Sequence, residues 1–395
     1  MQQEKPFWMQ IASSLKSFRR FFIVCLLLIA FELSLSPVLA YFVSDARLLR
    51  DYLEQNFFQT YKQTAQFLSG ELHIEPDEIR GWRNRPEAIK GNIRFDEYGS
   101  RSRHGVNPHS QEKTRMIFLG DSRMLGGDGV TNEQTINAFV ETGGIETLNF
   151  SSPDYSLDQS FLTMQAAQES FQPDVYVIGI GSQPGRLLRC LFLPFFDISI
   201  LPRMKPRFLD HHSKLDLLVP PYRRLLQHFP DNPDLIPYLK EHDGLFHRFQ
   251  RFKKEKVWRM TPFLAFMTKC WKAVSDRYGR NVANPIEGGN NKELTSALLD
   301  ATRQFAQSRK ARLIYIVFAK QSEIHGNSTW YDETIAQVRR HNILFVDTRL
   351  LFRQYPGLVD ELYLDDLHFS PRGNQIIAMV ISHMMERLEQ NRLDS

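Results

Sequence analysis

Three residue types that together can activate a hydroxyl for attack on an ester stand in two short motifs of this sequence. The first motif is Gly120-Asp121-Ser122, and the second places Asp365 three residues before His368. A serine hydroxyl is a weak nucleophile unless a base takes its proton, which histidine does near neutral pH. A carboxylate can hold the imidazole in the required tautomer. The residue types therefore predict acyl transfer through Ser122, with His368 as base and Asp365 as its partner.

The placement of the two motifs is more specific than their composition. In a chain of this size a Gly-Asp-Ser arises by chance about one time in ten, and an Asp-x-x-His about one time in two. However, the first follows a strand-like run and the second precedes the last helical pattern. The three-residue spacing favours Asp365 over Asp366 as the partner of His368. The alternatives are a turn serine at 122 and a helix-capping surface histidine at 368.

The elements that must bring these motifs together alternate along the chain. Short runs rich in β-branched and aromatic residues predict buried parallel strands, and amphipathic patterns between them predict helices. The predicted strands are 116–119, 147–150, 175–180, 313–318 and 343–346. The predicted helices are 132–141, 157–171, 292–309, 329–340 and 370–388. This alternation predicts an α/β fold with a doubly wound, parallel, five-stranded sheet, whose ligand site lies at the carboxyl ends of the strands.

Two segments stand outside this alternation. Residues 44–112 read as a stalk or lead-in segment. Residues 44–75 are expected to be helical, either as a stalk or as a helix that docks on the main domain, and residues 76–112 to form turns and short strands. Residues 184–290 read as an insertion within a catalytic domain at 113–390, with helices expected at 233–280 and a position near the mouth of the sheet. The stretch 186–280 carries a net charge of +10. Such an excess favours an anionic partner, such as phospholipid headgroups or an acidic polymer; a solvated surface explains it equally well.

The one long apolar run lies at 21–43, and Lys16, Arg19 and Arg20 precede it. About 20 helical residues cross the hydrocarbon layer, and basic residues stay on the cytoplasmic side. We therefore expect a cytoplasmic tail at 1–20, a single-pass signal-anchor at 21–43 and a periplasmic or otherwise extracytoplasmic catalytic domain. The alternative is a signal peptide cleaved near Ala40.

The composition of the chain excludes a disordered protein. The chain has 395 residues, of which 42% are hydrophobic and 24% charged, as in an ordinary globular protein. Its three cysteines have no metal-binding spacing, so we expect a fold that depends on neither a disulfide scaffold nor a structural zinc ion. A disulfide between Cys190 and Cys270 stays open, as does the oligomeric state. We expect a lipid bilayer and an acylated substrate as partners, and no nucleic acid.

Around both motifs the sequence resembles the SGNH/GDSL hydrolase family, in the form of its membrane-anchored members. The first block of that family is matched by Gly120-Asp121-Ser122, and the last by Asp365 and His368 with the following residues 369–374. The resemblance covers about 78–220 and 292–388. It implies cofactor-free hydrolysis or transfer of O-acyl groups, often on lipids or cell-envelope polysaccharides.

The second and third blocks depart from the family pattern. In the second, Asp154 stands where the family has a glycine whose backbone N–H faces the oxyanion. In the third, Ser182 and Gln183 stand where the family has an asparagine. The oxyanion candidates are therefore Ser122, Asp154, Ser182 and Gln183. Arg123 is a candidate for binding an anionic substrate group. Three functions remain: an esterase, an O-acyltransferase acting on extracytoplasmic polysaccharide, and a catalytically weak binding or assembly protein.

Overall fold

The computed structural model describes residues 45–393 with several gaps, and a few separate residues between 19 and 34. The gaps are 54–56, 105–107, 109–112, 142–143, 212–213, 260–288 and 327. The predicted tail at 1–20 and most of the predicted anchor at 21–43 lie outside the described residues. Among the helices that are described, none combines the length and the apolar character needed to cross a bilayer.

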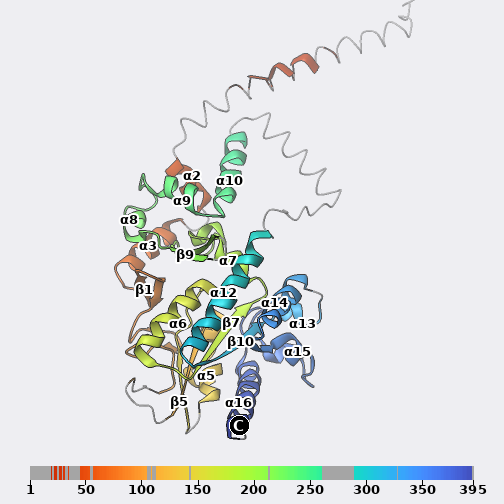
Figure 1. The fold of residues 1–395 in the computed structure, drawn as a ribbon. Helices are drawn as coiled ribbons and strands as arrows, with labels where there is room; N and C mark the ends of the chain where they lie inside the picture. Colours follow the sequence, from red (N-terminus) through yellow and green to blue (C-terminus); the bar gives the residue numbers. More distant parts are fainter. Residues whose placement is uncertain are drawn as a thin grey trace, which may run out of the picture.

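Five parallel strands form the central sheet (Figure 1), each at the position of a predicted strand. They are β5 (Thr114–Leu119), β6 (Ile145–Asn149), β7 (Val175–Gly181), β10 (Arg312–Phe318) and β11 (Leu344–Asp347). Their order across the sheet is β6-β5-β7-β10-β11. Because β6 and β7 flank β5 on opposite sides, the chain changes direction at the carboxyl end of β5. Such a switch point opens a ligand crevice, and the predicted doubly wound sheet is confirmed.

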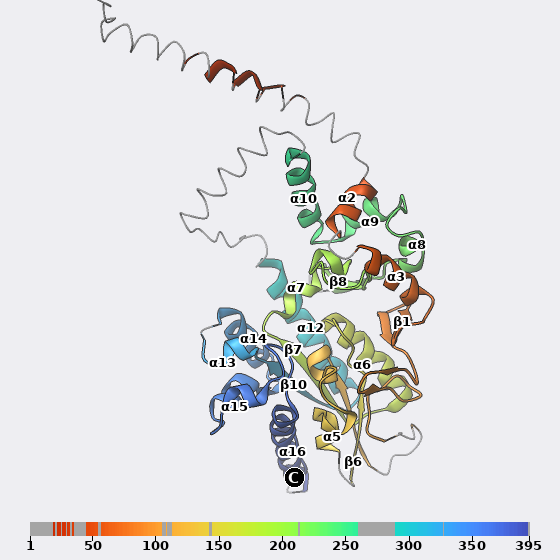
Figure 2. The ribbon, with the colours of Figure 1, turned by 180° about the vertical axis from the view of Figure 1, so that it is seen from behind.

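Helices cover both faces of the sheet. One face carries α6 (Leu157–Phe171), α12 (Gly289–Ser308) and α14 (Thr329–Arg340), and the other carries α5 (Ile136–Val140) and α16 (Pro371–Leu393), which pack against each other (Figures 1 and 2). All residues of β7 and most of β10 are buried, as expected for continuous apolar runs covered on both sides. The short helices α13 (Gln321–Ile324) and α15 (Thr348–Arg353) complete this half.

The helix predicted at 132–141 is the one that differs in form. It is divided into a 3-10 turn, η2 (Asn132–Gln134), and α5. Thr135 lies between them in an extended conformation, and its side chain accepts a hydrogen bond from the backbone N–H of Ala138. A threonine at this position begins a new helix rather than continuing the previous one. The helices predicted at 157–171 and 329–340 begin and end at the predicted residues.

The lead-in and the insertion form a second hydrophobic core together. The lead-in contributes α2 (Asp45–Tyr52), α3 (Phe57–Leu68), β1 (Ile74–Asp77) and β2 (Gly81–Asn84) to this core. Its β3 (Ile89–Lys90) pairs with β4 (Ile93–Arg94), and Ile93 packs with Leu125 in a separate small cluster. The insertion contributes α7 (Pro184–Leu188), η3 (Leu193–Phe195), β9 (Lys214–Leu218), α8 (Tyr222–Leu226), α9 (Leu235–His242) and α10 (Phe246–Arg259), whereas its β8 (Arg207–His211) places Phe208 in the core of the sheet domain. Trp82 of the lead-in and Phe192, Phe195 and Phe249 of the insertion are completely or almost completely buried in this core. Within its described part, the lead-in is therefore docked: residues 45–82 pack on the insertion, and residues 88–95 pack on Leu125 of the sheet domain.

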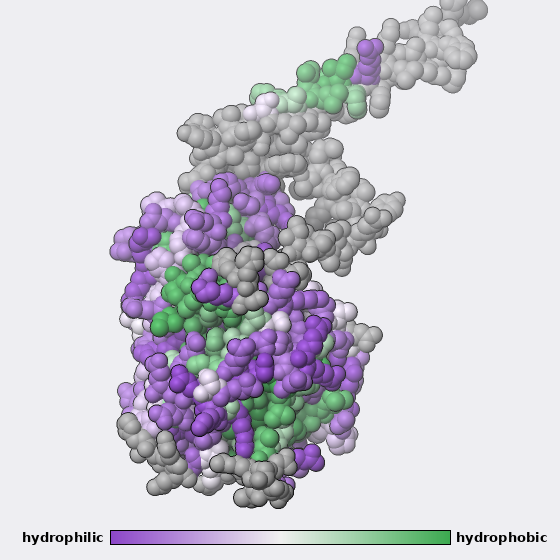
Figure 3. All heavy atoms as spheres, viewed as in Figure 1, coloured by the Kyte–Doolittle hydropathy of each residue, from purple (hydrophilic) through white to green (hydrophobic). Residues whose placement is uncertain are grey.

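Charges on the two segments also match. Lys253 and Lys256 of α10 pair with Asp45 and Asp51 of α2 at 2.5 and 3.4 Å. Part of the basic excess of the insertion therefore faces acidic residues of the lead-in. On the side seen in Figure 3, the surface over α8 and α9 is largely hydrophilic.

Cys190 lies in the second core, and its thiol donates to the carbonyl of Phe192 at 3.2 Å. Cys270 lies outside the described residues.

Candidate active site

Ser122 is the first residue of a short helix that begins just past β5. This helix, α4 (Ser122–Leu125), has Asp121 as its N-cap, whose carboxylate accepts a hydrogen bond from the backbone N–H of Arg123. Gly120 lies directly against the neighbouring strand, because a Cβ there would come 3.0 Å from the carbonyl oxygen of Gly179. The first motif therefore needs glycine for a close turn and aspartate for the cap, and these place Ser122 at the switch point.

Asp365 and His368 lie in a tight loop between η5 (Val359–Leu362) and α16. The backbone N–H of Leu364 donates to the carbonyl of His368 at 2.8 Å, and this closes the loop. The carboxylate of Asp365 accepts from the backbone N–H groups of Leu367 and His368 at 2.7 and 2.8 Å. These bonds fix the carboxylate before it meets the imidazole.

The three predicted catalytic side chains form one hydrogen-bonded chain. Nε2 of His368 lies 2.9 Å from Oγ of Ser122, and Nδ1 lies 2.8 Å from a carboxylate oxygen of Asp365. Burial alone would raise the pKa of Asp365, but the hydrogen bonds from the His368 side chain and from the two backbone N–H groups outweigh it and lower that pKa. The carboxylate is therefore ionised at neutral pH and accepts the Nδ1 proton, which leaves Nε2 as the acceptor facing Ser122.

Asp366, the neighbouring carboxylate, has a different place. Its side chain accepts from the backbone N–H of Ser322 at 2.9 Å, at the start of α13. It does not compete with Asp365 for the imidazole, in agreement with the preference for the three-residue spacing.

The turn after α4 supports the imidazole of His368. Gly126 and Gly127 have φ angles of +101° and +61°, and a Cβ at Gly127 would lie 3.3 Å from Cδ2 of His368. Arg101, fully buried in the lead-in, donates to the carbonyls of Leu125 and Gly127 at 3.0 and 2.9 Å, and to that of Val130 at 2.6 Å. Burial lowers the pKa of Arg101 to about 10. Sequence reasoning missed Arg101, because its partners are backbone carbonyls that carry no sequence signal.

A cavity of about 350 Å³ opens beside Ser122. Its lining includes all the remaining candidates, Arg123, Asp154, Ser182 and Gln183. The structure thus brings together residues from the ends of β5, β6 and β7. The lining also contains groups that the sequence did not single out, namely Tyr155, Leu157, Leu187, Phe196, Asp197, Lys320 and Leu367.

Asp154 has a backbone conformation that suits glycine, with φ at +63°. Its carboxylate forms an ion pair of 2.5 Å with Arg203 of the insertion. Arg203 is almost fully buried and its guanidinium lies over the ring of Trp82, 4.3 Å from the ring centroid. The carboxylate at this unusual position is therefore electrically compensated.

Ser182 and Gln183 follow the carboxyl end of β7. Ser182 is buried, and its carbonyl accepts from the hydroxyl of Thr334 in α14 at 3.1 Å. Gln183 is the N-cap residue of α7. Both residues border the cavity on the side of β7, adjacent to β5.

Arg123 lines the cavity, but its charge is already engaged. The guanidinium pairs with Asp121 and lies over the ring of Phe318. Burial would lower the pKa of Arg123, yet Asp121 more than offsets this and raises it. A Cβ on Gly181 would come 2.3 Å from the guanidinium, so the glycine makes room for it. The charge of Arg123 thus has an intramolecular partner beside Ser122.

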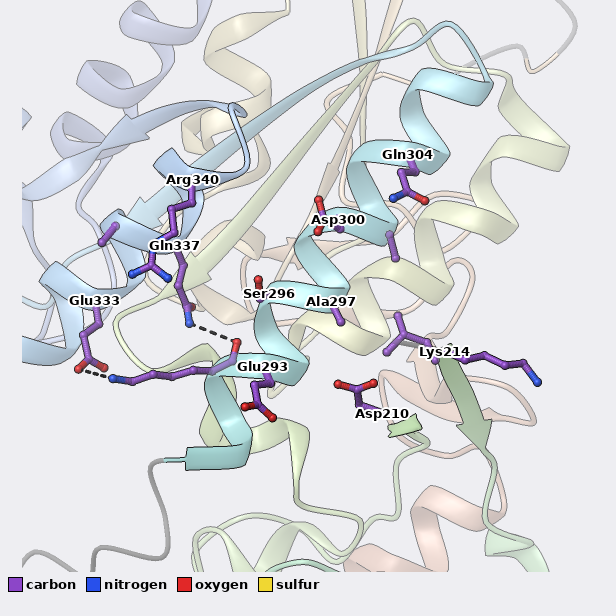
Figure 4. A pocket seen from close by; sticks show the side chains of 14 residues that line it. Asp210, Lys214, Glu293, Ser296, Ala297, Asp300, Gln304, Glu333, Gln337 and Arg340 are labelled. Atoms are coloured by element: carbon purple, nitrogen blue, oxygen red, sulfur yellow. Dashed lines mark hydrogen bonds and ion pairs between the residues drawn. The ribbon is translucent and has the colours of Figure 1, made fainter. Parts of the chain in front are cut away.

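A second chain of serine, histidine and aspartate lies elsewhere in the molecule. Oγ of Ser296 is 2.8 Å from Nε2 of His341, whose Nδ1 is 2.9 Å from Asp300. Ser296 and Asp300 border a wide groove of about 1140 Å³ between α12 and α14 (Figure 4). Ser296 lies inside α12, where backbone N–H groups are used by the helix and cannot stabilise an oxyanion. This chain of contacts therefore joins two helices, and Ser296 provides an internal comparison for Ser122.

Within the described part of the chain, no group of three or more His, Cys, Asp or Glu side chains is arranged to hold a metal ion.

No family model and no curated protein matches this chain. Among solved structures it is similar to LAE5, an alpha/beta hydrolase enzyme from the metagenome of Lake Arreo, with 13% identity and a TM-score of 0.35 over 70% of this chain and 97% of that one. It is similar to a GDSL-like lipase from Bacteroides thetaiotaomicron, with 10% identity and a TM-score of 0.36 over 72% and 93%. It is also similar to a lipase/acylhydrolase from Enterococcus faecalis, with 13% identity and a TM-score of 0.35 over 69% of this chain and 95% of that one.

Proposed function

We propose that this protein is a serine esterase that acts on O-acyl esters through Ser122, His368 and Asp365. The observation that carries the proposal is the hydrogen-bonded chain from Ser122 Oγ through His368 to Asp365, with distances of 2.9 and 2.8 Å. It lies at the carboxyl end of β5, where the doubly wound sheet opens a crevice. The resemblance of both motifs to the SGNH/GDSL hydrolases agrees with this assignment.

The geometry supports a two-step reaction. Oγ of Ser122 attacks the ester carbonyl while Nε2 of His368 takes its proton, and the same proton then passes to the leaving alcohol. A water molecule then attacks the acyl-serine, giving one proton to Nε2 and its hydroxyl group to the acyl carbon. The bond to Ser122 Oγ breaks, and Nε2 returns the proton to Oγ, which releases the carboxylic acid and restores the free serine. Asp365 holds the imidazole in the productive tautomer throughout.

The tetrahedral oxyanion needs hydrogen-bond donors beside Ser122. The backbone N–H of Ser122 belongs to the first turn of α4, where N–H groups have no partner within the helix. The backbone N–H of Asp154 is the second donor we propose, and the side chain of Ser182 or Gln183 the third. Each donor of this kind contributes about 10²–10³ in rate.

The cavity favours a small acyl group. Its volume of about 350 Å³ is at the low end for ligand sites, and Leu157, Leu187, Phe196 and Leu367 give it an apolar part. The apolar run at 21–43 supports the further proposal of a membrane anchor, with the catalytic domain on the extracytoplasmic side. An acylated lipid or cell-envelope glycan would then be the natural substrate.

Hydrolysis of p-nitrophenyl acetate tests the esterase directly. We expect Ser122→Ala to reduce kcat by at least about 10³-fold. Ser296→Ala, the matched control in the α12–α14 groove, should keep wild-type activity. Equal activity of Ser122→Ala and wild type would contradict the proposal.

An O-acyltransferase is the second candidate, because the same acyl-serine passes its acyl group to a sugar hydroxyl when water is excluded. Adding an oligosaccharide acceptor to the assay separates the two. Acylated oligosaccharide as the main product would identify a transferase, and free acetate as the main product an esterase. Absence of both products in a folded preparation would favour a binding or assembly protein.

A further inference from the structure

We propose that Arg203 is a positioning residue for catalysis. It compensates the charge of the Asp154 carboxylate, so that the backbone N–H of Asp154, the second proposed donor, can stabilise the oxyanion. This inference rests on the proposed function. The residue comes from the insertion, far in sequence from both motifs, and it acts only through Asp154.

The carboxylate of Asp154 is in a position where it would otherwise oppose the reaction. Asp154 borders the same cavity as Ser122, and its side chain keeps about a third of its surface exposed. A negative charge near the developing oxyanion raises the energy of the transition state, since both carry the same charge in a partly dehydrated site. With a φ angle of +63°, Asp154 has the backbone conformation that a glycine would adopt. Only the charge of its side chain therefore opposes the reaction.

Arg203 neutralises the charge of Asp154 through an ion pair in which the guanidinium is buried. Its guanidinium pairs with Asp154 at 2.5 Å while only 3% of its side-chain surface is exposed. Burial lowers the pKa of Arg203 and Asp154 opposes that change, yet a guanidinium stays protonated in proteins. The pair therefore carries no net charge next to the cavity.

The ring of Trp82 holds both partners in place. Arg203 lies over this ring at 4.3 Å. The indole N–H donates to the carbonyl of Pro153 at 3.2 Å, and the hydroxyl of Tyr155 donates to the carbonyl of Trp82 at 2.5 Å. The residues on both sides of Asp154 are thus tied to the residue on which Arg203 stacks. The lead-in, through Trp82, and the insertion, through Arg203, therefore together hold residues 153–155 in place.

A nearby ion pair offers a matched control. Lys205, two residues after Arg203, pairs with Asp158 at 2.5 Å, and both side chains are fully buried. Neither residue borders the cavity. Lys205→Met therefore removes a buried cation from the same segment without exposing a carboxylate to the reaction.

The test compares Arg203→Met, Arg203→Met/Asp154→Asn and Lys205→Met in ester hydrolysis, each assayed below its own Tm. We expect Arg203→Met to lower kcat by about 10–10²-fold with an unchanged KM. The double variant should regain most of the wild-type kcat, because Asn keeps the backbone N–H and tolerates the positive φ but has no charge. Lys205→Met should lower Tm and keep the wild-type kcat.

Three outcomes overturn the role of Arg203 while leaving the esterase in place. They are a wild-type kcat in Arg203→Met, a double variant as slow as Arg203→Met, and a Lys205→Met variant that loses kcat as strongly as Arg203→Met. A folded wild type with no activity on any ester would instead remove the proposed function, and the role of Arg203 with it.

Discussion

Ser122 and Ser296 have almost the same hydrogen-bond partners, but their positions differ in what they allow. Both serines touch a histidine that touches an aspartate. Ser122 begins a helix at the end of a central strand and borders a cavity, whereas Ser296 lies inside a long helix. The sequence predicted the first set because its residues stand in two compact motifs. It could not predict Arg101 or Arg203, whose partners are distant carbonyls or a distant carboxylate.

At the scale of single residues, the role of Asp365 as the partner of the His368 imidazole can be tested by itself. Asp365→Asn keeps the shape of the side chain but no longer fixes the Nδ1–H tautomer. We expect kcat to fall by about 10³–10⁴-fold. A stopped assay with p-nitrophenyl acetate measures this, and Asp366→Asn, whose carboxylate lies at the start of α13, serves as the control. A fall of similar size in Asp366→Asn would contradict the assignment of Asp365.

At the scale of elements, the strands and long helices could be predicted because their patterns are local. Continuous apolar runs gave all five strands of the sheet, and the helical period gave α6 and α14 at the predicted residues. The division between η2 and α5 was missed, because it depends on a single capping side chain, Thr135. The β8–β9 hairpin was also missed, since no residue of β9 is buried and the strand lacks the continuous apolar run that marks the strands of the sheet.

The turn after α4 gives the second prediction. Arg101→Leu leaves the carbonyls of Leu125, Gly127 and Val130 without their donor. We expect a loss of about 2–4 kcal/mol in the free energy of unfolding, and a fall in kcat because the support of the His368 ring moves. Urea unfolding and ester hydrolysis measure the two effects.

Arg115→Leu is the control for that variant. Arg115 is also buried, and it donates to the carbonyl of Phe171 at the opposite end of β5 from Ser122. It should destabilise the fold but keep kcat. If Arg101→Leu lowers stability without lowering kcat, the turn has no role in positioning the imidazole.

At the scale of the whole molecule, the main surprise is the second core. The lead-in and insertion looked like separate additions to the sheet domain, because no local pattern says that two distant segments pack together. Their shared aromatic core and the ion pairs between α2 and α10 make them one structural unit. This unit contacts the site through Trp82 and Arg203. The proposed role of Arg203 therefore makes catalysis depend on segments outside the sheet domain.

His73 of the lead-in makes the stability of the fold depend on pH. Burial lowers the pKa of His73 to about 4, helped by the positive charges of Lys90 and Arg203. In the unfolded chain the pKa is about 6.5, so as pH falls from there the unfolded state takes up a proton that the folded state refuses. The resulting stability is complete above the unfolded pKa and is lost progressively toward the folded one. We expect His73→Gln to lose less stability than wild type between about pH 7 and about pH 5. Urea unfolding at both pH values measures this, and equal losses would contradict the burial of a neutral imidazole.

The most direct test of the central claim is covalent labelling with a fluorophosphonate, followed by identification of the modified peptide. The account predicts phosphonylation at Ser122 in wild type and in Ser296→Ala, and none at that site in Ser122→Ala. It also predicts much slower labelling when His368→Gln removes the base. An unmodified Ser122 in folded protein, or modification of Ser296 while Ser122 stays free, would contradict it.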